Sequence, residues 1–323
     1  MANYNTPIEY LEQAVNSILS QTYSNFELII IDDASTDDSI KYLENIDDER
    51  IVLIKNEKNL GPAISRNEGI DIARGEYIAI LDSDDISRPD RLKYQLDFME
   101  NNPEVIVCGS WFEKFGIENQ IRKPLIEDFE LYRCQLLFSN TPLTLCHSTA
   151  MIRKSMLDEN NIRYDVTLPK AQDYGMWVVC SNYGKITILD KVLVKYRTHE
   201  MQISTKTREA QTDLADLVSR RQLEEIGVAF CKEEKRWRYD QVISKNDYIL
   251  FYDWIMSIKA ANLNFKRYDP SKLEQYLNCK LMNAVKRVKK TELIKIYLFS
   301  NKHTKELIRC LIKNSVKKRV SNG

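Results

Sequence analysis

The feature that most constrains the fold is an apolar stretch that ends abruptly in acidic residues. Residues 77–81 (YIAIL) are apolar without interruption, and carboxylates follow at Asp82, Asp84 and Asp85. An unbroken apolar run of this length is typical of a strand that is buried on both faces. Ligands of open α/β sheets bind at the carboxyl ends of such strands. A D-x-D pair there suits a hard divalent cation with phosphates among its ligands, and the alternative is that these acids only solvate a turn.

The chain before this stretch alternates strands and helices. Residues 26–33 (FELIIIDD) and 51–54 (IVLI) predict two more buried strands, and the first of them also ends in paired acids. Helices are predicted over residues 7–19, 38–45 and 62–73, the first with Thr6 as its N-cap residue and Pro7 at its first position. This alternation predicts right-handed crossovers and an α/β fold with a mostly parallel, doubly wound sheet. Such an architecture is typical of nucleotide-binding proteins.

Composition and charge bound the remaining possibilities. With 323 residues, of which 43% are hydrophobic, the chain can bury a large core and carry an appendage. Lys and Arg outnumber Asp and Glu by 26 to 14 in residues 201–323, although the whole chain is neutral. The seven cysteines show no C-x-x-C spacing, which favours reduced thiols and a cytoplasmic location.

Several short segments resemble, in order and spacing, the signatures of family 2 glycosyltransferases with the GT-A fold. They are residues 1–5 (MANYN), 20–23 (SQTY), 26–37 (FELIIIDDASTD), 59–61 (NLG), 66–69 (RNEG) and 75–85 (GEYIAILDSDD). The resemblance is close over about the first 115 residues and weaker to about residue 205. It implies an inverting transferase that moves one sugar from a nucleoside diphosphate donor to an acceptor hydroxyl.

The resemblance also implies a divalent cation, Mn²⁺ or Mg²⁺, as cofactor. Asp84 matches the direct metal ligand, whereas Asp82 matches a residue that orients the donor ribose or the metal's waters. His199, in the segment YRTH, matches a residue that folds back as a second metal ligand, with a loop hydrogen bond as the alternative. A cation there can stabilise the charge that develops on the β-phosphate of the departing nucleotide.

Other positions match donor-binding residues of the family. Tyr4 is expected to pack against the base, Asp33 to accept a hydrogen bond from uracil, and Arg66 and Ser83 to contact the donor. The alternatives are that Asp33 caps a loop and that Arg66 is a surface residue.

Asp173 matches the general base that takes the proton from the acceptor hydroxyl. Gln172 replaces the acid that usually precedes it, and the alternative role of Asp173 is an N-cap. For His147, a packed and hydrogen-bonded residue is the favoured interpretation. The chain has no Gln-x-x-Arg-Trp segment, which argues against a processive synthase.

The last third of the chain is expected to be helical. Helical spacing over residues 209–226, 247–261 and 272–288 predicts a C-terminal region over 206–323, beside a GT-A domain over 1–205. Basic and apolar residues interleave over 281–323, as on helices that lie on anionic membranes, so peripheral attachment to the inner face of the plasma membrane is a further expectation. No nucleic-acid-binding motif accompanies them.

The expected function is transfer of a sugar, from a UDP-sugar, to a glycan or lipid-linked acceptor in surface polysaccharide synthesis. This assignment of a pathway follows from family analogy. The alternatives are a catalytically impaired nucleotide-sugar-binding scaffold and a nucleotidyltransferase, although the latter would need a glycine-rich phosphate loop that the sequence lacks.

The start of the chain carries one more expectation. Residues 1–5 match the end of a central first strand that the family normally begins with about five apolar residues. The sequence therefore predicts a short or absent first strand, a gap in the middle of the sheet, and a reading frame that starts late at an internal Met.

Overall fold

The computed structural model describes residues 1–138, 145–200, 208–229 and 231–288, and six isolated positions between 294 and 305. These residues form two compact units, one of Met1–Phe129 and Thr141–Val218, the other of Glu130–Asn140 and Ser219–Gly323. The second unit thus takes in a segment from the middle of the domain expected over 1–205. It does so because Cys134, Leu137 and Phe138 are buried in the hydrophobic core of the second unit.

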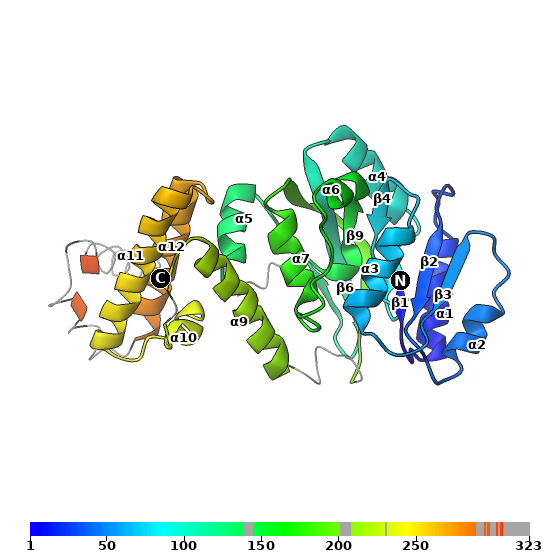
Figure 1. The fold of residues 1–323 in the computed structure, drawn as a ribbon, viewed down its shortest axis with the longest axis horizontal. Coiled ribbons are helices and arrows are strands. Elements are labelled where there is room, and N and C mark those ends of the chain that lie inside the picture. The colour runs from blue at the N-terminus through cyan, green and yellow to red at the C-terminus, as the bar shows by residue number, and fades with distance from the viewer. Residues whose placement is uncertain are drawn as a thin grey trace, which may run out of the picture. The chain divides into compact units, whose positions relative to one another are not determined.

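The first unit begins with a parallel three-stranded sheet (Figure 1). Its strands are β1 (Ala2–Asn3), β2 (Leu28–Asp32) and β3 (Ile51–Lys55), in the order β1-β2-β3. On one face, α1 (Ile8–Leu19) and α2 (Ser39–Glu44) pack through Leu11, Val15 and Leu43 against Ile30. On the other face lies α3 (Pro62–Ile72), whose Gly69 lies against Ile29 and Ile31. The predicted alternation of strands and helices is confirmed.

A second, mixed sheet completes the first unit. Its strands are β4 (Tyr77–Ala79), β5 (Ile86–Ser87), β6 (Val105–Gly116), β7 (Gln120–Arg122), β8 (Met151–Arg153) and β9 (Lys185–Thr198). They follow the order β4-β8-β6-β9-β5, with β7 paired to β6. Only β6 and β9 run parallel here, so the pairing is more mixed than expected. The reason is that β8 lies between β4 and β6 and runs opposite to both.

Three helices belong to this second sheet and its connections. They are α4 (Arg91–Asn101), α6 (Lys154–Glu159) and α7 (Gln172–Cys180). A 3₁₀ turn, η1 (His147–Thr149), leads into β8. The core between α4 and the sheet contains Leu92, Met99, Met151 and Leu193.

The structure confirms the short first strand and the break in the sheet. β1 has two residues and pairs with β2, whereas β4 pairs with β8, and among the described residues no ladder joins the two sheets. The expectation that Thr6 caps α1 is wrong, because Pro7 is the N-cap residue and no side chain caps the helix. Thr6 Oγ1 instead lies 2.7 Å from Ser83 Oγ, which ties the segment after β1 to the segment after β4.

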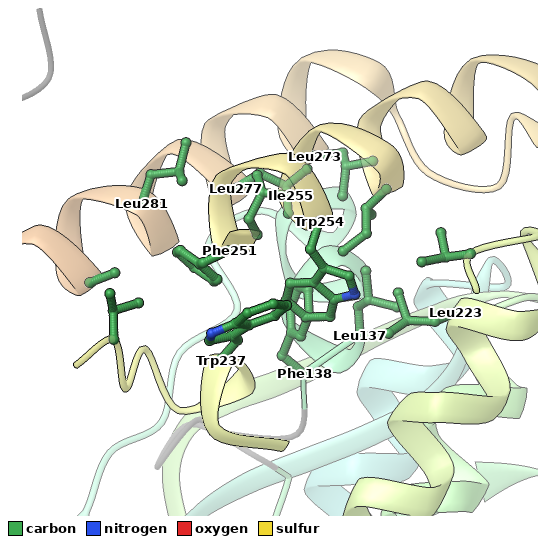
Figure 2. Packing of buried hydrophobic residues seen from close by; sticks show 14 of the residues in the cluster. Leu137, Phe138, Leu223, Trp237, Phe251, Trp254, Ile255, Leu273, Leu277 and Leu281 are labelled. Carbon is green, nitrogen blue, oxygen red and sulfur yellow. The ribbon is translucent and has the colours of Figure 1, made fainter. Parts of the chain in front are cut away.

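The second unit is helical. It contains α5 (Phe129–Leu136), the end of α9 (Arg208–Glu225), α10 (Glu234–Arg238), α11 (Lys245–Phe265) and α12 (Pro270–Arg287), which confirms the helices expected there. Trp237, Phe251 and Trp254 pack together at its centre, and Leu273, Leu277 and Leu281 of α12 complete the core (Figure 2).

Most of the basic segment 281–323 lies outside the described residues, and so does its expected contact with membranes. In the part of the chain that the structure describes, no helix is both long enough and apolar enough to cross a bilayer.

Candidate active site

Acidic side chains gather where β2 and β4 lead out of their sheets. Asp33 directly follows β2, and Asp82, Asp84 and Asp85 follow β4 by a few residues. The contact between Thr6 and Ser83 joins the segment after β1, the neighbour of β2, to the segment after β4. β2 and β4 belong to different sheets, so the expectation that two strand ends deliver acid to one edge remains a prediction.

Asp82 is held by two basic side chains. Arg66 Nη2 donates to Asp82 Oδ1 at 2.6 Å, and His147 Nδ1 lies 3.3 Å from the same oxygen. Burial alone would raise the pKa of Asp82, but the charge of Arg66 and the contact with His147 hold this pKa well below its usual range. Asp82 is therefore ionised, and two basic side chains hold one of its oxygens in place.

Asp84 faces a histidine from the far end of β9. His199 Nε2 lies 2.9 Å from Asp84 Oδ2, although the two residues are 115 positions apart. Burial, followed by the charge of Asp82, raises the pKa of Asp84. A divalent cation would offset both effects and stabilise the ionised carboxylate.

The Asp84–His199 pair fits a metal site. Two adjacent ligands at about 2.1–2.2 Å from an octahedral cation lie roughly 3 Å apart, close to the separation of these two atoms. Within the described residues no group of three or more His, Cys, Asp or Glu side chains could hold a metal. Mg²⁺ commonly takes few protein ligands and completes its shell with phosphate oxygens and water.

Asp85 has a supporting role. It is fully buried, and its Oδ1 accepts the backbone NH of Arg197 at 2.8 Å. Arg197 Nε also donates to the Asp84 carbonyl oxygen at 2.8 Å. Burial and the charges of Asp84 and Asp82 raise the pKa of Asp85 well above its usual range. These contacts fix the end of β9, and with it the approach of His199 to Asp84.

Asp33 fixes a loop in this structure. Its carboxylate accepts hydrogen bonds from Asn56 Nδ2 at 3.0 Å, the Leu60 NH at 2.9 Å and the Gly61 NH at 2.8 Å. A carboxylate has about four acceptor positions, so these three hydrogen bonds leave room for one more from a base. The expected contact with uracil remains a prediction. Tyr4, the other expected base contact, is half exposed and lies just beyond β1.

Asp173 lies in the first turn of α7, with Ala171 as the N-cap residue of that helix. The alternative interpretation of Asp173 as the N-cap is therefore wrong by two positions. Its charge acts on Arg66 and Tyr164, which places it near the side chains around Asp82. Asp173 is partly exposed, whereas Gln172 before it is buried.

Tyr164 is a member of this cluster that sequence reasoning missed. Its hydroxyl lies 2.9 Å from His147 Nε2, and its backbone forms two hydrogen bonds with the side chain of Asn67. The interpretation of His147 as a packed, hydrogen-bonded residue is confirmed. No local pattern marks Tyr164, because Asn67 lies 97 positions away from it.

The Arg66–Asp82 contact predicts a loss of stability in Arg66→Met. Removal of the guanidinium leaves a partly buried carboxylate short of a partner, which we expect to lower the free energy of unfolding by roughly 1–3 kcal/mol. Urea unfolding measures this change. The control is Arg163→Met, which breaks exposed ion pairs with Asp71 and Asp158 and should cost at most about 1 kcal/mol. Equal losses in the two variants would contradict the special role of Arg66.

Comparison with known proteins bears on the family of the chain. The Glycosyl transferase family 2 model matches residues 1–160. An uncharacterized glycosyltransferase of Methanocaldococcus jannaschii is 38% identical over 203 residues, which make up 61% of this chain and 69% of that protein. TuaG of Bacillus subtilis, named for teichuronic acid biosynthesis, is 43% identical over 120 residues. These residues make up 36% of this chain and 46% of TuaG.

Solved structures show the same fold. S. aureus TarS 1-349 in complex with UDP-GlcNAc matches with a TM-score of 0.56 at 17% identity, over 88% of each chain. At this identity the likeness bears on the fold alone, which is GT-A. The match to the family model and the similarity to the M. jannaschii protein show that the protein belongs to glycosyltransferase family 2 and is a glycosyltransferase.

Proposed function

We propose that the protein transfers a single sugar from a UDP-sugar, with inversion, to a hydroxyl of a glycan or lipid-linked acceptor in surface polysaccharide synthesis. The observation that carries this proposal is the pairing of Asp84 with His199 beside an Asp82 that Arg66 and His147 hold in place. This arrangement offers a cation site for a diphosphate next to a fixed acceptor for donor hydroxyls.

The names of similar proteins support the choice of donor and pathway. A solved structure of TarS contains UDP and another contains UDP-GlcNAc, and TuaG is named for teichuronic acid biosynthesis. UDP is also consistent with Asp33 and Tyr4, which follow β2 and β1 at the same edge.

The residues divide the work as follows. Asp84 and His199 would hold Mn²⁺ or Mg²⁺, which supplies Lewis-acid stabilisation of the leaving diphosphate when bound. Asp82 and Ser83 orient the donor sugar nucleotide, with Arg66 keeping Asp82 ionised. Asp173 takes the proton from the acceptor hydroxyl as its oxygen attacks the anomeric carbon. The glycosidic bond forms as the bond to the β-phosphate breaks, and the nucleoside diphosphate leaves.

A panel of nucleotide sugars tests this proposal. Each sugar is incubated with the full chain and Mn²⁺, and the release of nucleoside diphosphate is measured without an acceptor. We expect slow release from one or a few UDP-sugars and none from the other nucleotide sugars. Release from no donor, together with normal binding of UDP, would favour a nucleotide-sugar-binding scaffold instead.

We also propose that the basic segment 281–323 attaches the enzyme to anionic membranes. Vesicles that contain an anionic lipid should bind the full chain at low salt and release it at high salt, because each basic residue near the surface contributes about 1 kcal/mol. Truncation within α12 is unsuitable for this test, since Leu281 and Val285 are buried in the core. The variant Lys313→Gln/Lys317→Gln/Lys318→Gln/Arg319→Gln leaves α12 unchanged, and unchanged vesicle binding by this variant would contradict the proposal.

A further inference from the structure

A series of side-chain contacts leads from Asp82 through His147 to Tyr164, all within the first unit. His147 Nδ1 lies 3.3 Å from Asp82 Oδ1, and His147 Nε2 lies 2.9 Å from the Tyr164 hydroxyl. Both ring nitrogens of His147 are therefore engaged, on opposite sides of the ring. A ring held at both nitrogens has a fixed orientation.

The ionised state of Asp82 gives these contacts a direction. An ionised carboxylate only accepts hydrogen bonds, so the proton between Asp82 and His147 belongs to Nδ1 of the histidine. At the other nitrogen, burial raises the pKa of the Tyr164 hydroxyl, which therefore keeps its proton. His147 thus has a defined partner on each side.

Tyr164 is itself held in place from α3. The Asn67 side chain donates to the Tyr164 carbonyl at 2.9 Å and accepts the Tyr164 backbone NH at 2.8 Å. The guanidinium of Arg66, the neighbour of Asn67 on α3, lies 6.0 Å from the centre of the Tyr164 ring. Tyr164 is also buried. Its hydroxyl is therefore a fixed point against which the His147 ring is oriented.

The His147 ring also packs against α7. Its centre lies 6.1 Å from that of Trp177, which is buried. Trp177 follows Asp173 by four positions, so both side chains lie on the same face of α7. The charge of Asp173 acts on Tyr164, which agrees with a face turned toward this cluster. The His147 ring thus lies between the Asp82 carboxylate and the face of α7 that carries Asp173.

We propose that His147 and Tyr164 are positioning residues, which set the distance between the donor at Asp82 and the base at Asp173. This inference rests on the roles proposed above for Asp82 and Asp173. The acceptor oxygen must attack in line with the departing diphosphate, and a misplacement of about 1 Å can lower a rate 10²-fold. Contacts from Asp82 to a buried tyrosine and a buried tryptophan restrict such misplacement.

Tyr164→Phe tests the hydroxyl alone, because the ring stays. We expect kcat to fall by roughly 10–100-fold, since His147 loses its fixed partner and the donor and the base shift relative to each other. The KM for the donor should change by less than about threefold, because Asp82 keeps its hydrogen bond from Arg66. This split between kcat and KM is the mark of a positioning residue.

The matched control is Tyr77→Phe. The Tyr77 hydroxyl also takes part in a hydrogen bond of the first unit, which Arg153 Nη1 donates at 2.9 Å. A merely structural hydroxyl contributes to stability and not to kcat, so Tyr77→Phe should keep the kcat of the parent chain. Equal kcat values in Tyr164→Phe and Tyr77→Phe would overturn the proposal.

His147→Asn separates the two halves of this series of contacts. The amide of Asn can donate to Asp82 from a place close to that of Nδ1, but it is too short to reach the Tyr164 hydroxyl. We expect it to lower kcat about as much as Tyr164→Phe. The double variant should lose less than about threefold more than either single variant, because residues that act as one unit are not additive. Losses that multiply in the double variant would contradict the proposal.

NMR tests the same link without turnover. In the absence of any ligand, the ¹⁵N signals of His147 should show a protonated Nδ1, and a ring protonated on Nε2 alone would overturn the proposal. UDP with Mg²⁺ should shift the indole NH signal of Trp177 in the parent chain and in Tyr77→Phe, but much less in Tyr164→Phe. No shift in the parent chain, or equal shifts in all three, would also overturn it. Failure of the proposed function appears separately, as binding of UDP without cleavage of any nucleotide sugar.

Discussion

Asp173→Asn is expected to reduce sugar transfer by about 10²–10⁴-fold, the usual effect of a lost general base. The side chain lies in the first turn of α7, partly exposed, and its charge acts on Arg66 and Tyr164 beside Asp82. An amide in its place keeps the size of the side chain but cannot take a proton from the acceptor. Turnover should therefore fall while the affinity for UDP stays within a few-fold of the parent value.

The matched control is Asp190→Asn, the same change at an exposed position of β9. It should leave both turnover and UDP affinity unchanged. An equal loss of UDP binding and turnover in Asp173→Asn would show that this residue shapes the site rather than acting as the base. Isothermal titration with UDP and a coupled assay of UDP release measure the two quantities separately.

Asp84→Asn and His199→Ala are each expected to lower turnover by at least about 10²-fold and to weaken Mn²⁺ binding in the presence of UDP. The two side chains lie 2.9 Å apart and are the pair that fits a cation. Loss of either leaves the cation with one protein ligand, and the leaving diphosphate then lacks its main charge stabilisation. Electron paramagnetic resonance of free Mn²⁺ measures the binding, and excess chelator should abolish turnover of the parent chain.

Asp97→Asn serves as the control, since Asp97 is an exposed acid on α4. Its Mn²⁺ binding and turnover should equal those of the parent. Full turnover in excess chelator would refute the metal assignment and indicate that basic side chains alone stabilise the leaving group.

The sequence predicted the features of the fold that depend on local patterns. Apolar runs located β2, β3 and β4, and helical spacing located α11 and α12. Two features depend on contacts between residues that lie far apart in the sequence. They are the antiparallel pairing of β8 with its neighbours and the place of residues 130–140 in the second unit. Thr6 shows the limit of local rules, because a tertiary contact with Ser83 replaced the cap that its position predicted.

The same division applies to the site. Short motifs pointed to Asp82, Asp84 and His199, and the structure brings Asp84 and His199 into contact. The motifs could not show that Arg66 binds Asp82, or that Tyr164 and His147 complete that cluster, since each contact joins different elements. The Asp33 carboxylate likewise accepts hydrogen bonds from the backbone NH groups of Leu60 and Gly61, and its motif does not reveal these contacts.

The most direct test of the central claim is the stereochemistry of donor cleavage. Proton NMR can follow the full chain with Mn²⁺ and the UDP-α-sugar that the panel identifies, and can report which anomer of the free or transferred sugar forms first. Attack opposite the leaving diphosphate, with Asp173 as the base, predicts the β-anomer, and chelator or Asp173→Asn should suppress its formation. Initial formation of the α-anomer, or cleavage that neither treatment slows, would contradict the proposed inverting mechanism.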